Sequence, residues 1–228
     1  MPKKKVFLFF LATTLFFLFI FFSYVVAKEK FTKLDFDTTV KLQDHISRRW
    51  DIPFSILSLM GLPEVTSIAW LILLIILLLK KYFLASLSLF LFWVGLAIEL
   101  YGKLFVLHPA PQFFLYRGVF KFGFTSYYVH TDYSYPSGHV YRTTFLVAFL
   151  LVWSYFNLKG SIKMIFYILF ITFWIAMLVS RVYLGEHWLS DVIGGGLIGS
   201  SFGILSSIFI PTTNKLKKNE LTEQLNRI

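Results

Sequence analysis

The chain has no cysteine among its 228 residues, which excludes disulfides and thiolate chemistry. Charge is also scarce: only 15% of the residues are Asp, Glu, Lys or Arg, whereas a soluble domain averages about 25%. Hydrophobic residues make up 57% of the chain, and the mean hydropathy is +0.70. A soluble particle could not be covered with so little polar surface. The composition therefore predicts an integral membrane protein.

Long apolar runs are what the sequence has in place of charge. A transmembrane helix needs about 20 residues, and six runs approach or exceed that length. Backbone groups in hydrocarbon must pair within their own segment, so we expect each run to be a helix. The sequence thus predicts an all-α polytopic membrane protein, a bundle of six transmembrane helices. The runs are Val6–Ala27, Pro63–Leu79, Tyr82–Leu107, Val140–Leu158, Met164–Leu184 and Trp188–Ile210.

Three parts can be distinguished along the chain. Residues 1–34 are predicted to hold the first transmembrane helix and its connection, residues 35–212 the main membrane domain, and residues 213–228 a basic cytoplasmic tail. Within the main domain, Asp35–Met60 is expected to be an interfacial helix that leads into the second span. A signal peptide is the alternative for the first run, but an apolar stretch of about 20 residues is longer than the usual signal core and favours a retained helix.

Lysines in the short connections indicate the orientation. With six spans they fall on one side, which the positive-inside rule makes cytoplasmic. Both termini are then cytoplasmic in an inner (plasma) membrane, and the connection at 108–137 lies outside. The net charge of +10 fits this topology and contact with anionic headgroups. Because no basic module stands apart from the spans, we expect no nucleic-acid partner. These lysines are Lys3–Lys5, Lys80-Lys81, Lys159, Lys163, Lys215 and Lys217-Lys218.

Polar residues at membrane depth are costly and therefore indicate function. Three polar clusters map to the outer ends of the predicted spans, so we expect one extracytoplasmic site. They run from Lys103 to Pro111, from Pro136 to His139, and from Ser180 to Asp191.

In the third cluster, His187 and Asp191 are four residues apart and share one face of a helix. A carboxylate in that position can hold the proton of one imidazole nitrogen and leave the other nitrogen basic, as nucleophilic catalysis requires. Arg181 offers a planar fork suited to phosphate oxygens. The alternative is that Arg181 and Asp191 form an interfacial ion pair while His187 extends to the surface.

The second cluster predicts a helix N-terminus capped by Ser137, whose free N–H groups would attract an anion. Beside it, His139 could donate a proton to a leaving oxygen, unless the segment is an ordinary helix start with a hydrated histidine. Lys103 either pairs with Glu99 one turn earlier or directs its charge toward the same phosphate, and these two interpretations are compatible.

Together the clusters resemble the three-part signature of the type-2 phosphatidic acid phosphatase superfamily, whose members share their core with vanadium haloperoxidases. The resemblance covers roughly residues 35–210, and its second and third motifs match in full. The residues that carry it are Lys103 and Pro111, then Pro136-Ser137-Gly138-His139, then Ser180-Arg181 with His187 and Asp191.

The resemblance implies that His187 is a nucleophile that forms a phosphohistidine and that Asp191 orients it. His139 would protonate the leaving group and later activate water. The opposite protonation states required of the two histidines predict a bell-shaped pH profile. The family needs no metal or other cofactor. The implied phosphate-binding groups are Lys103, Arg181, Ser137 and the Gly138 amide.

One position departs from the family pattern. Ala110 stands where an arginine precedes the proline of the first motif, so one phosphate-binding cation is missing. We expect Arg142 or His108 to take its place; Arg117 and Lys121 are further possibilities.

The outer loop between Pro111 and Pro136 is rich in aromatic residues, which predicts an interfacial belt, a half-buried lid over a lipid chain, or simple anchoring. These residues are Phe113, Phe114, Tyr116, Phe120, Phe122, Phe124, Tyr127, Tyr128, Tyr133 and Tyr135.

The function implied by the resemblance is metal-independent dephosphorylation of a membrane lipid phosphate or pyrophosphate, with undecaprenyl pyrophosphate as the first expectation. Phosphatidic acid, phosphatidylglycerol phosphate and the phosphates of lipid A are other substrates that similar cores handle. Two alternatives stay open. One is a lipid-phosphate binding or transport protein with a degraded catalytic site, which Ala110 would support, and the other is a lipid phosphotransferase.

Overall fold

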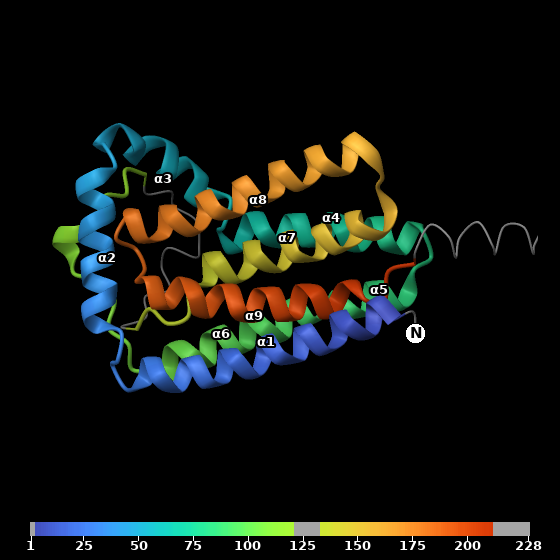
Figure 1. The fold of residues 1–228 in the computed structure, drawn as a ribbon, viewed down its shortest axis with the longest axis horizontal. Helices are drawn as coiled ribbons and strands as arrows, with labels where there is room; N and C mark the ends of the chain where they lie inside the picture. Colours follow the sequence, from blue (N-terminus) through green and yellow to red (C-terminus); the bar gives the residue numbers. More distant parts are fainter. Residues whose placement is uncertain (1–2, 121–132, 212–228) are drawn as a thin grey trace, which may run out of the picture.

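The computed structural model describes residues 3–120 and 133–211. Long helices lie side by side in an elongated bundle, and α2 crosses one end of it (Figure 1). The all-α prediction is confirmed, since the described segments hold helices and one isolated bridge between Pro109 and Tyr133. The elements are α1 (Lys3–Ala27), α2 (Thr32–His45), η1 (Arg48–Trp50), α3 (Asp51–Leu59), α4 (Pro63–Leu79), α5 (Phe83–Ser88), α6 (Leu91–Phe105), η2 (Phe113–Leu115), α7 (Gly138–Asn157), α8 (Gly160–Tyr183) and α9 (Leu189–Ser207).

Four segments are long and apolar enough to cross a membrane: α1, the α5–α6 segment Phe83–Phe105, α8 and α9. A fifth span results if Arg48–Leu59 and α4, bent by 47° at their junction, form one broken span. Six spans were predicted, and α7 is the helix that this count leaves out. Its first turns carry polar residues such as Arg142 and Thr143, and much of its length is buried among its neighbours. The expected tail at 213–228, Lys121 and the loop aromatics from Phe122 to Tyr128 lie outside the described residues.

The core of the bundle is the packing of α7 against α9. Three small residues one turn apart let the two backbones approach, as in other helix pairs that pack through small residues. A Cβ atom at these positions would lie 2.5–2.6 Å from the carbonyl oxygens of Ser137, Tyr141 and Phe145. The small residues are Gly195, Gly199 and Gly203 of α9.

Helix α1 packs along α9 (Figure 1). Phe16 stacks on Phe202 with ring centroids 5.6 Å apart, and the Ser201 hydroxyl donates to the Ala12 carbonyl at 2.8 Å. The first apolar run is therefore part of the bundle.

At the end that α2 crosses, the loop after α6, the start of α7 and the α8–α9 turn meet. Gly185 in this turn has φ +65°, and a Cβ there would lie 2.3 Å from the Leu115 carbonyl oxygen, so the turn needs a glycine. The Gln43 amide of α2 donates to the carbonyls of Leu115 at 2.6 Å and Tyr183 at 2.8 Å. These bonds fasten α2 over the end of the bundle.

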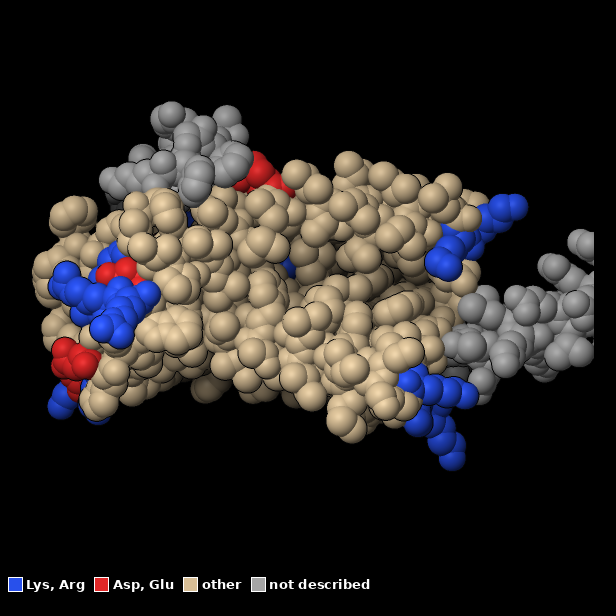
Figure 2. Space-filling view, turned by 90° about the horizontal axis from the view of Figure 1, so that it is seen from above, with Lys and Arg blue, Asp and Glu red and all other residues tan. Residues whose placement is uncertain are grey.

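The opposite end holds the start of α1 and the α7–α8 connection. There Lys4 donates to the Tyr155 hydroxyl at 2.9 Å, and Lys163 lies 4.2 Å from the centre of the same ring. Most charged side chains seen from above lie toward the two ends, and the surface between them carries few charges (Figure 2). Such a surface is what the hydrocarbon of a bilayer would cover.

Candidate active site

The three polar clusters of the sequence meet at the end of the bundle crossed by α2. The charges of Arg181, Arg142 and Lys103 all act on His139, and His187 is another of its close neighbours. These residues come from α6, α7, α8 and the α8–α9 turn. The structure therefore brings the sequence-predicted residues into one place, while their individual roles stay predictions.

His187 and Asp191 form the expected couple, although they do not share one helix: His187 lies in the α8–α9 turn and Asp191 in the first turn of α9. His187 Nδ1 lies 3.3 Å from Asp191 Oδ2, which also accepts the Trp188 backbone N–H at 3.0 Å. Burial, together with the charges of Arg181 and Lys103, holds the pKa of His187 below its ordinary value, although Asp191 opposes this shift. The imidazole is thus kept neutral, with Nε2 as the nitrogen that does not face the carboxylate.

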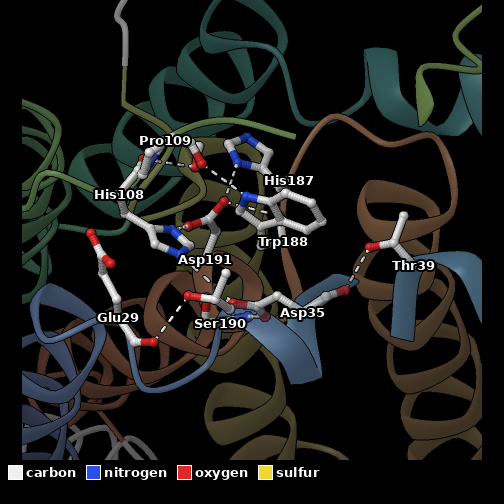
Figure 3. A network of polar contacts seen from close by, with 11 residues as sticks. Glu29, Asp35, Thr39, His108, Pro109, His187, Trp188, Ser190 and Asp191 are labelled. Atoms are coloured by element: carbon white, nitrogen blue, oxygen red, sulfur yellow. Dashed lines mark hydrogen bonds and ion pairs between the residues drawn. The ribbon is translucent and has the colours of Figure 1, made fainter. Parts of the chain in front are cut away.

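His108 lies on the other side of the same carboxylate. Its Nδ1 is 2.9 Å from Asp191 Oδ1, and its Nε2 is 3.7 Å from Asp35 Oδ2 (Figure 3). The predicted substitute for the family arginine therefore contacts Asp191 and Asp35. Asp35, in the first turn of α2, was not predicted as a site residue, because nothing in the spacing of the sequence links it to a partner 155 positions away at Ser190.

A second buried network joins Lys103, Glu99 and Arg142. Glu99 accepts from Lys103 Nζ at 3.0 Å and from Arg142 Nη1 at 2.9 Å, and Arg142 also donates to the Gly61 carbonyl at 3.1 Å. A Cβ on Gly138 would lie 2.0 Å from the Glu99 carboxylate and 2.7 Å from Arg142 Nη1. Glycine at this position lets the network lie directly against the N-terminus of α7.

The N-terminus of α7 supplies groups suited to an anion. Ser137 is the N-cap residue, and its fully buried hydroxyl has no hydrogen-bond partner among the residues that the structure describes. Its backbone N–H donates to the Asp191 carbonyl at 3.0 Å, which ties this terminus to α9. A buried hydroxyl without a partner is costly, so a ligand oxygen is a natural partner for it.

Arg181 is buried at the end of α8 and contacts the Ser58 hydroxyl of α3 and the Glu186 carboxylate. The Arg181 carbonyl accepts the backbone N–H groups of Glu186 and His187, both at 3.2 Å, which shapes the turn that carries His187. Arg117, another possible substitute for the missing arginine, donates to the Tyr183 hydroxyl at 3.3 Å. Ala110 itself is exposed.

An apolar groove of about 490 Å³ adjoins the site. It lies among α4, α7 and α8, and Met60 and Thr143 are part of its lining. The Thr143 hydroxyl donates to the His139 carbonyl at 2.7 Å, and a Cβ on Gly61 would lie 2.8 Å from the His139 ring. Two lining residues of the groove, Met60 and Thr143, are therefore close to His139: Thr143 bonds to its carbonyl, and Met60 precedes Gly61.

Within residues 3–120 and 133–211, no group of three or more His, Asp or Glu side chains is arranged to hold a metal ion. The site combines three histidines, a carboxylate shared by His108 and His187, three buried or half-buried cations and a helix N-terminus.

Fold and site together define a polytopic helical membrane protein with a polar, histidine-containing centre at one end. The family model described as the PAP2 superfamily matches residues 79–215, more than half of the chain and all three motifs. The chain belongs to the PAP2 superfamily.

Two known proteins are similar to it. An undecaprenyl-diphosphatase of Sulfolobus acidocaldarius is 40% identical over 94 residues, and this match spans 40% of the present chain and only 39% of that relative. The crystal structure of a transmembrane PAP2-type phosphatidylglycerolphosphate phosphatase from Bacillus subtilis superposes with a TM-score of 0.65 at 20% identity, covering 87% of this chain and 94% of the other. The second match shows a shared fold.

Proposed function

We propose that this protein hydrolyses a membrane lipid phosphate or pyrophosphate through a phosphohistidine intermediate on His187. The observation that carries the proposal is the His187–Asp191 couple, with the charges of Arg181 and Lys103 acting on His187. An apolar groove lined in part by Met60 and Thr143 lies near His139, the second histidine of the site. A neutral nucleophile, cations for a phosphate and a channel for a chain are the three requirements of such a reaction.

In the proposed reaction, Lys103, Arg181, the Ser137 hydroxyl and the Gly138 N–H bind the phosphoryl oxygens. His187 Nε2 attacks phosphorus, and the bond from phosphorus to the leaving oxygen breaks. His139 donates a proton to that oxygen. His139 then accepts a proton from water, whose oxygen attacks the phosphohistidine, so that inorganic phosphate is released and His187 is restored.

Both expected substitutes for the family arginine, His108 and Arg142, direct donors at groups of the protein itself. His108 contacts two carboxylates, and the guanidinium of Arg142 bonds to Glu99 and the Gly61 carbonyl. We therefore propose that Arg142 contributes its charge to the site without gripping the phosphate. Ala110 would then leave more space around the substrate headgroup than the family arginine would.

The groove among α4, α7 and α8 would take the lipid chain, with its headgroup beside His139. The undecaprenyl-diphosphatase relative favours a prenyl pyrophosphate, and the Bacillus phosphatase makes phosphatidylglycerol phosphate the second substrate to test. We place the site on the extracytoplasmic face, with α7 as the sixth span and α2 along the membrane surface. The lysine-rich opposite end supports this orientation.

The test is phosphate release from a panel of lipid phosphates in detergent with EDTA, comparing wild type, His187→Ala and His45→Ala. His45 is an exposed histidine near the end of α2 and serves as the matched control. Release by wild type and His45→Ala but not by His187→Ala supports the proposal.

Release by His187→Ala at the wild-type rate contradicts the proposal. Lipid binding without release by the wild type favours a binding or transport protein. Phosphate transfer to an added alcohol or sugar acceptor in preference to water favours a phosphotransferase.

A further inference from the structure

Asp191 shares its carboxylate between two histidines. Oδ2 faces His187 Nδ1 at 3.3 Å, and Oδ1 faces His108 Nδ1 at 2.9 Å (Figure 3). The shorter contact is the one to His108. Two contacts therefore hold the Asp191 carboxylate from the side away from the His187 ring or from the backbone: His108 Nδ1 at Oδ1, and the Trp188 N–H at Oδ2, 3.0 Å away.

His108 is held in turn by Asp35 of α2. Asp35 Oδ2 lies 3.7 Å from His108 Nε2, and the Asp35 side chain is almost fully buried. Asp35 accepts the Ser190 backbone N–H at 2.8 Å and the Ser190 hydroxyl at 2.7 Å. The Ser190 N–H is one of the free donors at the N-terminus of α9, so this carboxylate also caps that helix.

The protonation state of His108 follows from its position between two carboxylates. A neutral ring would direct a lone pair at either Asp191 or Asp35, whereas an imidazolium donates toward both. Although burial opposes the charge, the hydrogen bond and the charges of Asp191, Asp35 and Glu29 raise the pKa of His108 above its ordinary value. Tyr135 also faces His108: its ring meets the imidazole edge-on with centroids 6.4 Å apart.

We propose that His108 is a positioning residue, an imidazolium that fixes Asp191 and through it the nucleophile His187, with Asp35 holding His108 in place. This inference rests on the proposed role of His187. It extends the His187–Asp191 couple to a buried chain of four residues that reaches from the α8–α9 turn to α2. Because α2 contributes Asp35, the helix that crosses the end of the bundle becomes part of the catalytic apparatus.

Removing His108 has a defined electrostatic consequence. The positive charge of His108 offsets part of the attraction between Asp191 and a proton on His187. Without it, Asp191 favours the protonated form of His187 more strongly, so the pKa of His187 rises. The acid limb of the pH profile, where His187 must lose its proton to attack, then moves to higher pH.

The experiment compares pH–rate profiles of wild type, His108→Ala, His108→Asn and Asp35→Asn. His108→Ala is expected to lower kcat by about 10–100-fold, as for other residues that orient a reacting group, with KM little changed. Asn can replace the Nδ1–H donor but not the charge. His108→Asn should therefore recover most of kcat while its acid limb, like that of His108→Ala, lies about one pH unit higher.

Asp35→Asn tests the residue of this network that lies farthest from His187. With the Asp35 charge removed, His108 loses its proton more easily and then, like Asn at this position, offers a donor without a charge. The acid limb of Asp35→Asn should therefore lie between those of wild type and His108→Asn, with kcat above the acid limb close to wild type. Ser201→Ala is the control: it removes a buried hydroxyl of α9 whose bond goes to the Ala12 carbonyl, and its profile should equal that of wild type.

An unchanged kcat and acid limb in His108→Ala would overturn the inference. If His108→Ala does not fold, His108→Asn provides the test: an acid limb of His108→Asn at the wild-type position would also overturn the inference. A pH–rate profile of Asp35→Asn that equals wild type at every pH would show that Asp35 does not hold His108 in its proposed role. Failure of the proposed function is distinguishable, since it is recognised by an active His187→Ala, whatever the His108 variants do.

Discussion

The packing of α7 on α9 allows a sharp prediction for two adjacent glycines. A Cβ at Gly195 would lie 2.5 Å from the Ser137 carbonyl oxygen, whereas one at Gly196 would have no atom within 4 Å. Ordinary contact begins at 3.4 Å, so Gly195→Ala must separate the two backbones locally by about 0.9 Å. The groups to be moved are backbone atoms of α7, which cannot rotate away as a side chain can.

The magnitude follows from this displacement. Overpacking of this kind costs about 1–3 kcal/mol of the free energy of unfolding. For a chain of this size, that corresponds to a fall in Tm of roughly 2–12 °C. Ser137 is also the N-cap residue of α7, and its backbone N–H donates to the Asp191 carbonyl at 3.0 Å. A shift of about 1 Å between catalytic groups can reduce kcat by about 100-fold, so Gly195→Ala should lose activity as well.

Gly196→Ala is the matched control, because it makes the same chemical change one residue away on the same helix. Alanine favours a helix over glycine by about 1 kcal/mol, so this variant should be as stable as wild type or slightly more stable. The assay is thermal unfolding in detergent followed by phosphate release at a temperature where both variants are folded. Equal Tm and equal kcat for the two variants would refute the close α7–α9 packing.

Three further predictions concern charge, pH and the lipid chain. Glu99→Gln removes the anion shared by Lys103 and Arg142, so it should lower the free energy of unfolding by about 3–5 kcal/mol, whereas the exposed-site variant Glu29→Gln should be neutral in thermal unfolding. Because the pKa of His187 is lowered, kcat/KM should fall only as pH drops below about 6.5, and an acid limb centred above that value in wild type would contradict the assignment. Ala69→Trp fills the groove and should raise KM for a long-chain lipid phosphate but not for a short-chain analogue. An equal change in KM for both substrates would show that the groove does not bind the lipid chain.

Much of the fold could be predicted from the sequence because helix formation in an apolar run depends on residues that are near one another in the chain. The run Pro63–Leu79 coincides with α4, since proline favours the first helical position and the apolar residues then continue to the lysines. The run Tyr82–Leu107 was expected as one helix, but it contains a break between α5 and α6. That break leaves the Leu89 carbonyl to accept the Trp70 indole N–H at 2.9 Å, a tertiary contact that no periodicity reveals.

The contacts of the site could likewise be predicted only in part from the sequence. Spacing along one helix predicted the Lys103–Glu99 pair, because residues four apart on a helix are neighbours. The His187–Asp191 contact was expected on the same ground, but His187 lies in the turn before α9, and the contact forms because Asp191 in the first turn of α9 faces back toward that turn. The contacts of Asp35 with His108 and Ser190 depend on where α2 lies across the end of the bundle, which the sequence pattern does not define. Sequence reasoning expected an interfacial helix there but had no means of placing one of its carboxylates behind the site.

Trapping the covalent intermediate tests the proposed role of His187. Wild type, His187→Ala and His45→Ala would be mixed with a lipid pyrophosphate carrying a labelled terminal phosphate, quenched within milliseconds in alkali, which preserves phosphohistidine, and digested to locate the label. We expect label on His187 in wild type and His45→Ala and none in His187→Ala. Steady turnover by wild type without any labelled enzyme, or label that persists in His187→Ala, would contradict this role.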